Sequence, residues 1–239
     1  MAISTNPLAW LRSVQPRRAI AFLLLLLPLT VGAQTVRDLW LSMPPSLAPY
    51  LSTSLRTQCL DFYDMHTDAQ TDNALKGKSR IDTLTSTFLA ATLSKAHTLQ
   101  MKLLPASGSA SGLGSSMVSG SGSSSSLSSC DSVLCVVRSW DGPKRDSEVQ
   151  LFDRQWKPLQ APLTFSADSF VCRPDTMSEE RFSRLVALLD PIMFSVSLSP
   201  AENVLLVKLS PVVPNPEDEK AIEQILVQRK LKWDSKTFK

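Results

Sequence analysis

The hydrophobic and polar positions of this sequence are patterned most clearly between residues 133 and 156. Every residue from 133 to 137 is apolar, which is typical of a strand covered on both faces, whereas residues 148–153 mix apolar and polar positions. The Asp-Gly-Pro sequence at 141–143 favours a turn, because glycine tolerates positive φ and proline cannot donate to a β-ladder. The pattern predicts an antiparallel hairpin with a seven-residue turn region, whose first strand is central and whose second strand lies nearer an edge.

Two stretches near the N-terminus have helical spacing of their apolar residues. They predict a short helix over residues 35–43 and a longer amphipathic helix over residues 46–62. Pro44 and Pro45 separate the two helices, and Ser46 is placed to cap the second one. The apolar stripe of the second helix contains Leu47, Tyr50, Leu51, Leu55, Cys59 and Phe62.

Five further segments predict strands, because they either alternate between apolar and polar residues or are apolar on both faces. These strands cover residues 84–90, 99–103, 192–198, 204–209 and 225–234. Lysines along one face of the last segment suit an edge strand. Asp175 or Ser178 starts a predicted helix that Pro191 ends, and Pro216 starts another that reaches about Gln224. Together these elements predict an α+β fold, an antiparallel β-sheet of hairpins packed by the N-terminal helices and one or two later helices.

Residues 106–129 interrupt this pattern, because 13 of these 24 residues are serine and 5 are glycine. A segment with so little to bury is expected to be flexible. Since it separates two predicted strands, we interpret it as a long loop inserted within one domain and not as a linker between domains.

Residues 1–33 have the pattern of a secretory signal peptide, with a basic start, an apolar run and small residues at the end. The apolar run contains Pro28 and is shorter than the roughly 20 residues that span a bilayer, so we expect cleavage before Gln34. No cysteine follows the small residues, so the attachment signal of a bacterial lipoprotein is missing. The sequence predicts a periplasmic or secreted protein with no transmembrane segment after cleavage, in which residues 34–239 form a single domain.

Charge argues against one class of partner. Of the 25 basic residues, three lie in the predicted signal peptide, and the remaining 22 equal the 22 acidic residues. The mature chain is therefore formally neutral and lacks the positive field that attracts nucleic acid, so we exclude nucleic acid as a partner.

The four cysteines, Cys59, Cys130, Cys135 and Cys172, match no zinc-binding spacing. An oxidising compartment would permit disulfides with three possible connectivities. Cys135 shares a strand face with Val133 and Val137, which favours a buried thiol at that position.

The sequence contains none of the common motifs of serine hydrolases, nucleotide-binding loops or zinc peptidases. A hydrolase with an unrecognised active site would have to recruit His66 or His97, the two histidines, or use a lysine or carboxylate as its base. His97 precedes a predicted strand, and we expect it in a surface turn. No cofactor is predicted, and the catalytic residues of this alternative stay unknown.

The polar stretch after the second helix contains Asp64, His66 and Asp68, which are weak candidates for metal ligands. A calcium loop does not fit, because Ala69 stands where a glycine is expected and Leu75 stands where the closing glutamate is expected. We favour a solvated acidic loop and predict no metal.

Trp140, Trp156 and Trp233 are weak candidates for lining a ligand groove. Large aromatic residues at strand ends more often pack in the core or at its rim, which is the alternative interpretation.

Several motifs are similar to those of a family of secreted Bacteroidales proteins classified as domain of unknown function 3256. They are MPPSLAPYL at 43–51, CLDF at 59–62, LQMKLLP at 99–105, LCVVRSWDGPKRDSEVQLFDRQWKPL at 134–159 and ILVQRKLKW at 225–233. The resemblance implies an exported protein of that bacterial order. It implies no activity and no functional residue, because the family has no established function.

The absence of catalytic motifs favours a non-enzymatic binding or structural module of the cell envelope, which contacts an unknown protein or envelope component through a sheet face or edge. Two alternatives remain. One is the hydrolase, and the other is a carrier of a small apolar ligand, which requires a cavity between sheet and helices.

Overall fold

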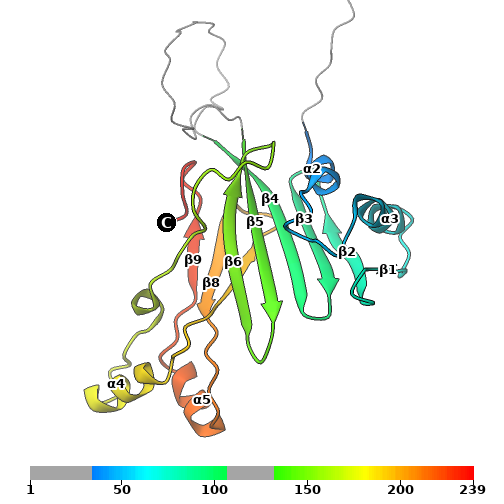
Figure 1. Cartoon of the computed structure of the whole chain (residues 1–239). Coiled ribbons are helices and arrows are strands. Elements are labelled where there is room, and N and C mark those ends of the chain that lie inside the picture. The colour runs from blue at the N-terminus through cyan, green and yellow to red at the C-terminus, as the bar shows by residue number, and fades with distance from the viewer. Residues whose placement is uncertain (1–33, 107–131) are drawn as a thin grey trace, which may run out of the picture. The chain divides into compact units, whose positions relative to one another are not determined.

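The computed structural model describes residues 34–106 and 132–239, and this part of the chain forms two antiparallel sheets (Figure 1). The larger sheet has the strand order β1-β2-β3-β4-β5-β6 and the smaller has the order β7-β8-β9. The strands are β1 (Thr71–Asp72), β2 (Lys78–Leu84), β3 (Phe88–Ser94), β4 (His97–Pro105), β5 (Ser132–Asp141), β6 (Arg145–Phe152), β7 (Phe194–Leu198), β8 (Val204–Leu209) and β9 (Arg229–Lys232). The helices are α2 (Val36–Ser42), α3 (Thr53–Asp64), α4 (Glu179–Ala187), α5 (Pro216–Glu223) and the short 3-10 helix η3 (Ala167–Phe170). The predicted α+β class is confirmed.

Strand β5 separates two hydrophobic clusters, because successive side chains of a strand point to opposite faces. Leu134 and Val136 pack on the side of α2 and α3, whereas Val133, Cys135 and Val137 pack toward the smaller sheet. All five side chains are buried. β5 lies between β4 and β6, and β6 is the last strand of its sheet, so the predicted central and outer positions are confirmed.

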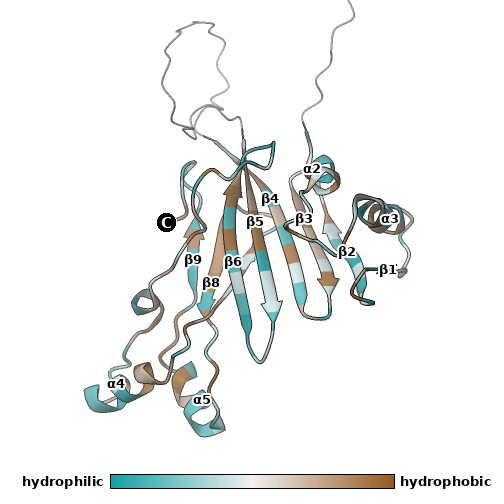
Figure 2. Cartoon of the chain, in the orientation of Figure 1, coloured by the Kyte–Doolittle hydropathy of each residue, from teal (hydrophilic) through white to brown (hydrophobic). Residues whose placement is uncertain are grey.

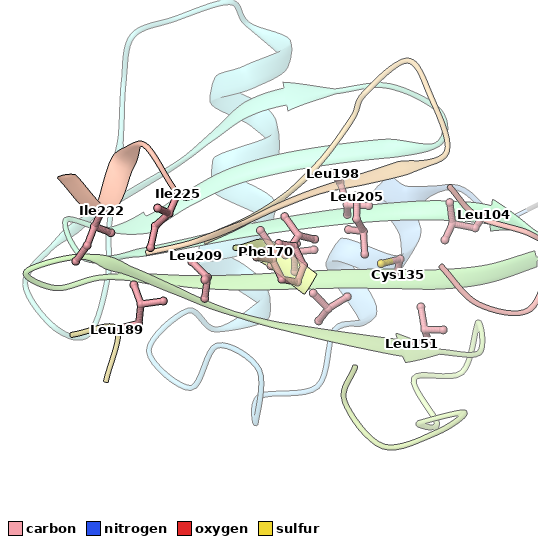
Figure 3. Packing of buried hydrophobic residues seen from close by; sticks show 14 of the residues in the cluster. Leu104, Cys135, Leu151, Phe170, Leu189, Leu198, Leu205, Leu209, Ile222 and Ile225 are labelled. Atoms are coloured by element: carbon pink, nitrogen blue, oxygen red, sulfur yellow. The ribbon is translucent and has the colours of Figure 1, made fainter. Parts of the chain in front are cut away.

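The second cluster fills the space between the two sheets. Figure 3 shows Cys135 of β5 in the same packed layer as Leu198 of β7 and Leu205 of β8. β7 contacts β4, β5 and β6, and no comparable contact joins the smaller sheet to β1 or β2. The smaller sheet therefore covers only part of the larger one, and Figure 2 shows its strand β8 as apolar and its outer strand β9 as largely hydrophilic.

Side chains of the larger sheet accept hydrogen bonds from backbone N–H groups on the outer edge of β7. The backbone N–H of Leu198 donates to the side-chain oxygen of Gln100 at 2.7 Å, and the N–H of Val196 donates to the Ser147 hydroxyl at 3.1 Å. An unpaired strand edge is a site for unwanted association, and these contacts remove that risk at β7.

Most predicted elements are confirmed, but several boundaries were wrong, among them the start of the last strand, which is Arg229 and not residue 225. The second helix is capped by Ser52 and not by Ser46, because residues 46–51 form turns. Residues 84–90 do not form one strand, since Leu84 ends β2 and Phe88 begins β3. The strands of the central hairpin extend further than predicted, which shortens its turn to residues 142–144.

The cysteines within the described residues are free thiols. Cys59 and Cys135 are buried in the clusters on opposite faces of the larger sheet, and Cys172 is exposed. The predicted burial of Cys135 is confirmed. Cys130, the predicted signal peptide and residues 107–129 of the predicted insert lie outside the described residues, whereas Ala106 is buried.

Candidate functional site

The candidate site is a groove between helix α3 and the outer edge of strand β2. β1 pairs only with Lys78 and Ser79, so residues 80–84 of β2 have no strand partner on that side in the described part of the chain. A pocket of about 330 Å³ lies there. Its lining residues come from α3, the loop that follows and β2, and they are Cys59, Phe62, Tyr63, His66, Thr67, Asp68, Ala69, Arg80, Ile81 and Asp82.

The backbone of Ile81 is the part of β2 that is free to pair in this groove. Alternate residues of an antiparallel strand direct their N–H and C=O groups to opposite sides, and Ser79 pairs with Thr71 of β1. Beyond an irregularity in β2, the N–H of Leu84 donates to the Tyr63 hydroxyl at 3.1 Å, so this position is also occupied. Between Ser79 and Leu84, the alternation directs the N–H and C=O of Ile81 toward the pocket.

Asn73 holds the end of the groove rigid. Its buried side-chain amide donates to the Ser79 hydroxyl at 3.0 Å and to the Leu93 carbonyl at 2.8 Å. Its side-chain oxygen accepts from the backbone N–H groups of Leu75 and Gly77, each at 3.0 Å. A buried amide with all these partners fixes the β1–β2 turn in one conformation.

His66 ends helix α3 in the left-handed conformation, with φ of 52°. The N–H of His66 donates to the carbonyl of Tyr63, and the N–H of Thr67 donates to the carbonyl of Phe62. Glycine is the usual residue at this position of a helix terminus. An imidazole occupies it here and lines the pocket.

The structure brings together two of the three weak metal candidates. His66 and Asp68 both line the pocket, whereas Asp64 forms two hydrogen bonds with the Arg37 guanidinium, at 2.8 and 2.5 Å. This bonding to Arg37 lowers the pKa of Asp64. Across residues 34–106 and 132–239, no group of three or more histidine, cysteine or acidic residues is arranged to hold a metal.

The three tryptophans do not lie together. Trp156 packs in the cluster beside α2, where its indole N–H donates to the Ser42 hydroxyl at 3.3 Å. Trp233 packs on the other side of the larger sheet, and its indole N–H donates to the Pro105 carbonyl at 2.7 Å. Trp140 is 39% exposed at the end of β5. Trp156 and Trp233 therefore pack at the rims of the two hydrophobic clusters, on opposite faces of the larger sheet.

The prediction that His97 lies in a surface turn was wrong. His97 begins β4 and is 7% exposed, because Trp140 on β5 stacks against its ring at 5.2 Å between centroids. Its Nδ1 is hydrogen-bonded to the Tyr50 hydroxyl. Burial, with a smaller contribution from the positive charge of Arg138, lowers the pKa of His97 to about 4. A cross-strand aromatic neighbour was not visible from the local sequence around His97.

The titratable groups of the groove are not arranged like a cysteine hydrolase. Cys59 lies in the same pocket as His66, but burial raises the pKa of its thiol. A cysteine nucleophile requires the opposite shift, toward the thiolate. The Cys59 thiol instead donates to the backbone carbonyl of Ser79 at 3.8 Å. The arrangement supports holding a ligand more than activating a nucleophile.

None of the helices within the described residues is long and apolar enough to cross a membrane.

Comparison with known proteins gives the fold and the family. The fold is similar to that of a solved domain of an uncharacterized protein from Porphyromonas gingivalis W83, a member of the Bacteroidales. The TM-score is 0.57 at 20% sequence identity, over 85% of this chain and 98% of that chain, so the likeness shows the fold alone. No curated protein matches the sequence. The model of a family described as "Protein of unknown function (DUF3256)" matches residues 28–119 and 123–238. This match confirms the resemblance seen in the sequence motifs, and the chain belongs to the DUF3256 family.

Proposed function

We propose that this protein is an exported, non-enzymatic binding module of the bacterial cell envelope, which takes up a short extended segment of a partner polypeptide in the groove between α3 and β2. The observation that carries the proposal is the unpaired stretch of β2 beside a pocket of about 330 Å³. Strand addition to a sheet edge obtains affinity from main-chain hydrogen bonds and specificity from pockets for side chains.

The ends of the groove limit what it accepts. β1 pairs with the outer edge of β2 as far as Ser79. At the other end, the backbone N–H of Leu84 is already hydrogen-bonded to the Tyr63 hydroxyl. A bound segment therefore pairs chiefly with Ile81 and places one side chain in the pocket beside Phe62. So short a contact implies weak affinity for an isolated peptide, with the remaining affinity supplied by the rest of the partner.

The α3–β2 groove supports neither alternative. An apolar carrier requires an apolar cavity, but His66, Asp68, Arg80 and Asp82 line the pocket and make it polar. A cysteine hydrolase requires an activated thiol, whereas burial raises the pKa of the Cys59 thiol.

The proposed export follows from residues 1–33 of the sequence and has its own test. We expect protein isolated from the periplasm or culture medium to begin at Gln34, which mass spectrometry of the intact protein and N-terminal sequencing will determine. Protein that retains residues 1–33 in the cytoplasm would contradict the export proposal without affecting the groove.

A library of random heptapeptides displayed on phage tests the groove directly. We expect selected peptides to bind the wild-type protein and to lose binding when a single backbone nitrogen facing Ile81 is methylated. The Ala69→Trp substitution should fill the pocket and reduce binding at least tenfold, since Ala69 lines it. Ala74→Trp is the matched control, because Ala74 is exposed on the adjacent turn and does not line the pocket. Equal binding to both variants would overturn the proposal.

A further inference from the structure

A second surface lies on the other face of the same strands. The smaller sheet packs over β4, β5 and β6, and Phe88 at the start of β3 is buried in the cluster between the sheets, but the same face is open to solvent farther along, where β2 carries Lys78 and Arg80. Lys78 and Arg80 of β2 are exposed on this face, beside Thr92 and Ser94 of β3. Figure 1 shows β8 and β9 at the β6 side of the larger sheet, away from β2 and β3.

The open face is hollowed and carries positive charge. A depression of about 450 Å³ lies over it, lined by Gln70, Lys76, Gly77, Lys78, Arg80, Thr92, Ser94 and Lys95. The lining contains four cationic side chains and no carboxylate. We call these lining residues the basic face.

Ion pairs neutralise only half of these cations. Lys78 pairs with Asp72 at 2.6 Å, and Arg80 pairs with Asp82 at 2.7 Å. Lys76 and Lys95 have no ion-pair partner within the described residues. The chain after Ala33 is formally neutral, so this excess is a local feature and not a consequence of overall composition.

We propose that the basic face binds an acidic oligosaccharide, whose sugar carboxylates pair with Lys76 and Lys95. A depression of this size falls within the roughly 300–1,000 Å³ typical of small-ligand sites. The site is separate from the peptide groove, although Arg80 borders both. The inference therefore stands or fails independently of the proposed function.

The polar groups of the face select a sugar over a polypeptide. The backbone groups that join β2 to β3 and β3 to β4 are engaged in the shared ladder, so on the strands themselves recognition of a ligand falls mainly to side chains. Ser94 accepts a hydrogen bond from the N–H of Ala96, which leaves its hydroxyl proton free to donate. Gln70 presents both donor and acceptor atoms. Such groups suit sugar hydroxyls, while the lysines suit carboxylates.

The test uses a fluorescently labelled oligomer of galacturonic acid and the full chain. We expect binding that weakens as salt is added, because screening acts on exposed charges. The double substitution Lys76→Gln and Lys95→Gln should weaken binding at least fivefold. The matched control is Lys157→Gln with Lys236→Gln, two exposed lysines outside the basic face.

Three outcomes would overturn the proposal. Equal binding by the two double variants would place the site elsewhere. Equal affinity for a neutral dextran would show that charge is not recognised, and equal affinity for polyglutamate would show that the ligand is not selected as a sugar. Both double variants alter exposed side chains, so equal melting temperatures are the check that folding is intact.

Discussion

The ammonium group of Lys102, in the middle of β4, donates a hydrogen bond of 2.6 Å to the backbone carbonyl oxygen of Ser199. It also donates to the carbonyl oxygens of Pro200 at 3.0 Å and Glu202 at 2.7 Å. Lys102 is 2% exposed, and this burial lowers its pKa. The three carbonyls belong to the turn between β7 and β8, so one buried cation fastens the smaller sheet to the larger one.

Replacing Lys102 with methionine tests this connection. The Lys102→Met protein keeps most of the side-chain volume but removes the ammonium donor from three carbonyl groups, of which, within the described residues, only that of Glu202 keeps another donor, the Val204 N–H, and this should cost about 2–4 kcal/mol of unfolding free energy. Urea titration measures the loss. Lys157→Met, at an exposed position, is the control and should stay within about 0.5 kcal/mol of the wild type. A similar small effect at Lys102 would show that the turn does not need the ammonium group.

Acid should destabilise the protein through His97. Its pKa is lowered to about 4 in the folded protein by burial, and it is near 6.5 in an unfolded chain. Between these values only the unfolded chain binds the proton, so the stabilisation is fully present above about pH 6.5 and is lost as the pH falls toward about 4. We expect a loss of about 2 kcal/mol between about pH 7 and about pH 5.

The control for this pH effect is His97→Gln, which cannot titrate in this range. Carboxylates elsewhere also contribute at acidic pH, so the relevant quantity is the difference between the two proteins in urea titrations at each pH. If the wild type and His97→Gln lose the same free energy, the folded pKa of His97 is not lowered.

The fold was predictable where a pattern is local. The hairpin of β5 and β6 and the hairpin of β7 and β8 follow from alternation and turn residues within about twenty positions of sequence. The start of α3 was missed because Leu47 and Leu51 continue its apolar stripe and are buried, although they belong to turns. Apolar residues that are buried and spaced as in a helix therefore do not always belong to one.

The candidate site was less predictable, because it depends on contacts between distant segments. The sequence singled out His66 and Asp68, which do line the groove, but for metal binding. The free backbone of Ile81 depends on β1 having only two residues, and no local pattern marks this. His97 was misplaced for the same reason, since Tyr50 and Trp140 bury it from other segments.

Glycine at position 66 should stabilise the protein. His66 has a φ of 52°, which glycine adopts without the strain that a side chain introduces. We expect His66→Gly to raise the unfolding free energy by up to about 1 kcal/mol, and His66→Ala to give no such gain, because alanine keeps the strain. Thermal melts of the two variants measure the difference. If His66→Gly is less stable than the wild type, the imidazole makes a stabilising contact that outweighs the backbone strain.

Removing the serine-rich insert should leave the fold intact. Pro105 and Ser132 are paired neighbours on β4 and β5, so the chain can be closed between them by a short turn. Ala106 should be kept, because it is buried in the core between the sheets. We expect a variant in which Asn-Gly replaces residues 107–131 to melt within about 4 °C of the wild type, since shortening a loop lowers the entropy cost of closing it. A larger drop would show that the insert packs against the domain.

The contrast between Val137→Asp and Lys230→Ala tests the two-layered packing on which the other inferences depend. Val137 is 1% exposed in the core between the sheets, where an unpaired carboxylate costs several kcal/mol. That cost is comparable to the roughly 5–15 kcal/mol that stabilises a whole domain, so Val137→Asp should fail to fold.

Lys230 lies on the outer strand β9 and pairs with Glu202 at 2.5 Å, but both side chains are about half exposed. Such an exposed pair contributes little to stability, and Lys230→Ala should therefore unfold near the wild-type urea concentration. A soluble Val137→Asp protein with a cooperative urea transition would show that β5 is not the centre of this fold.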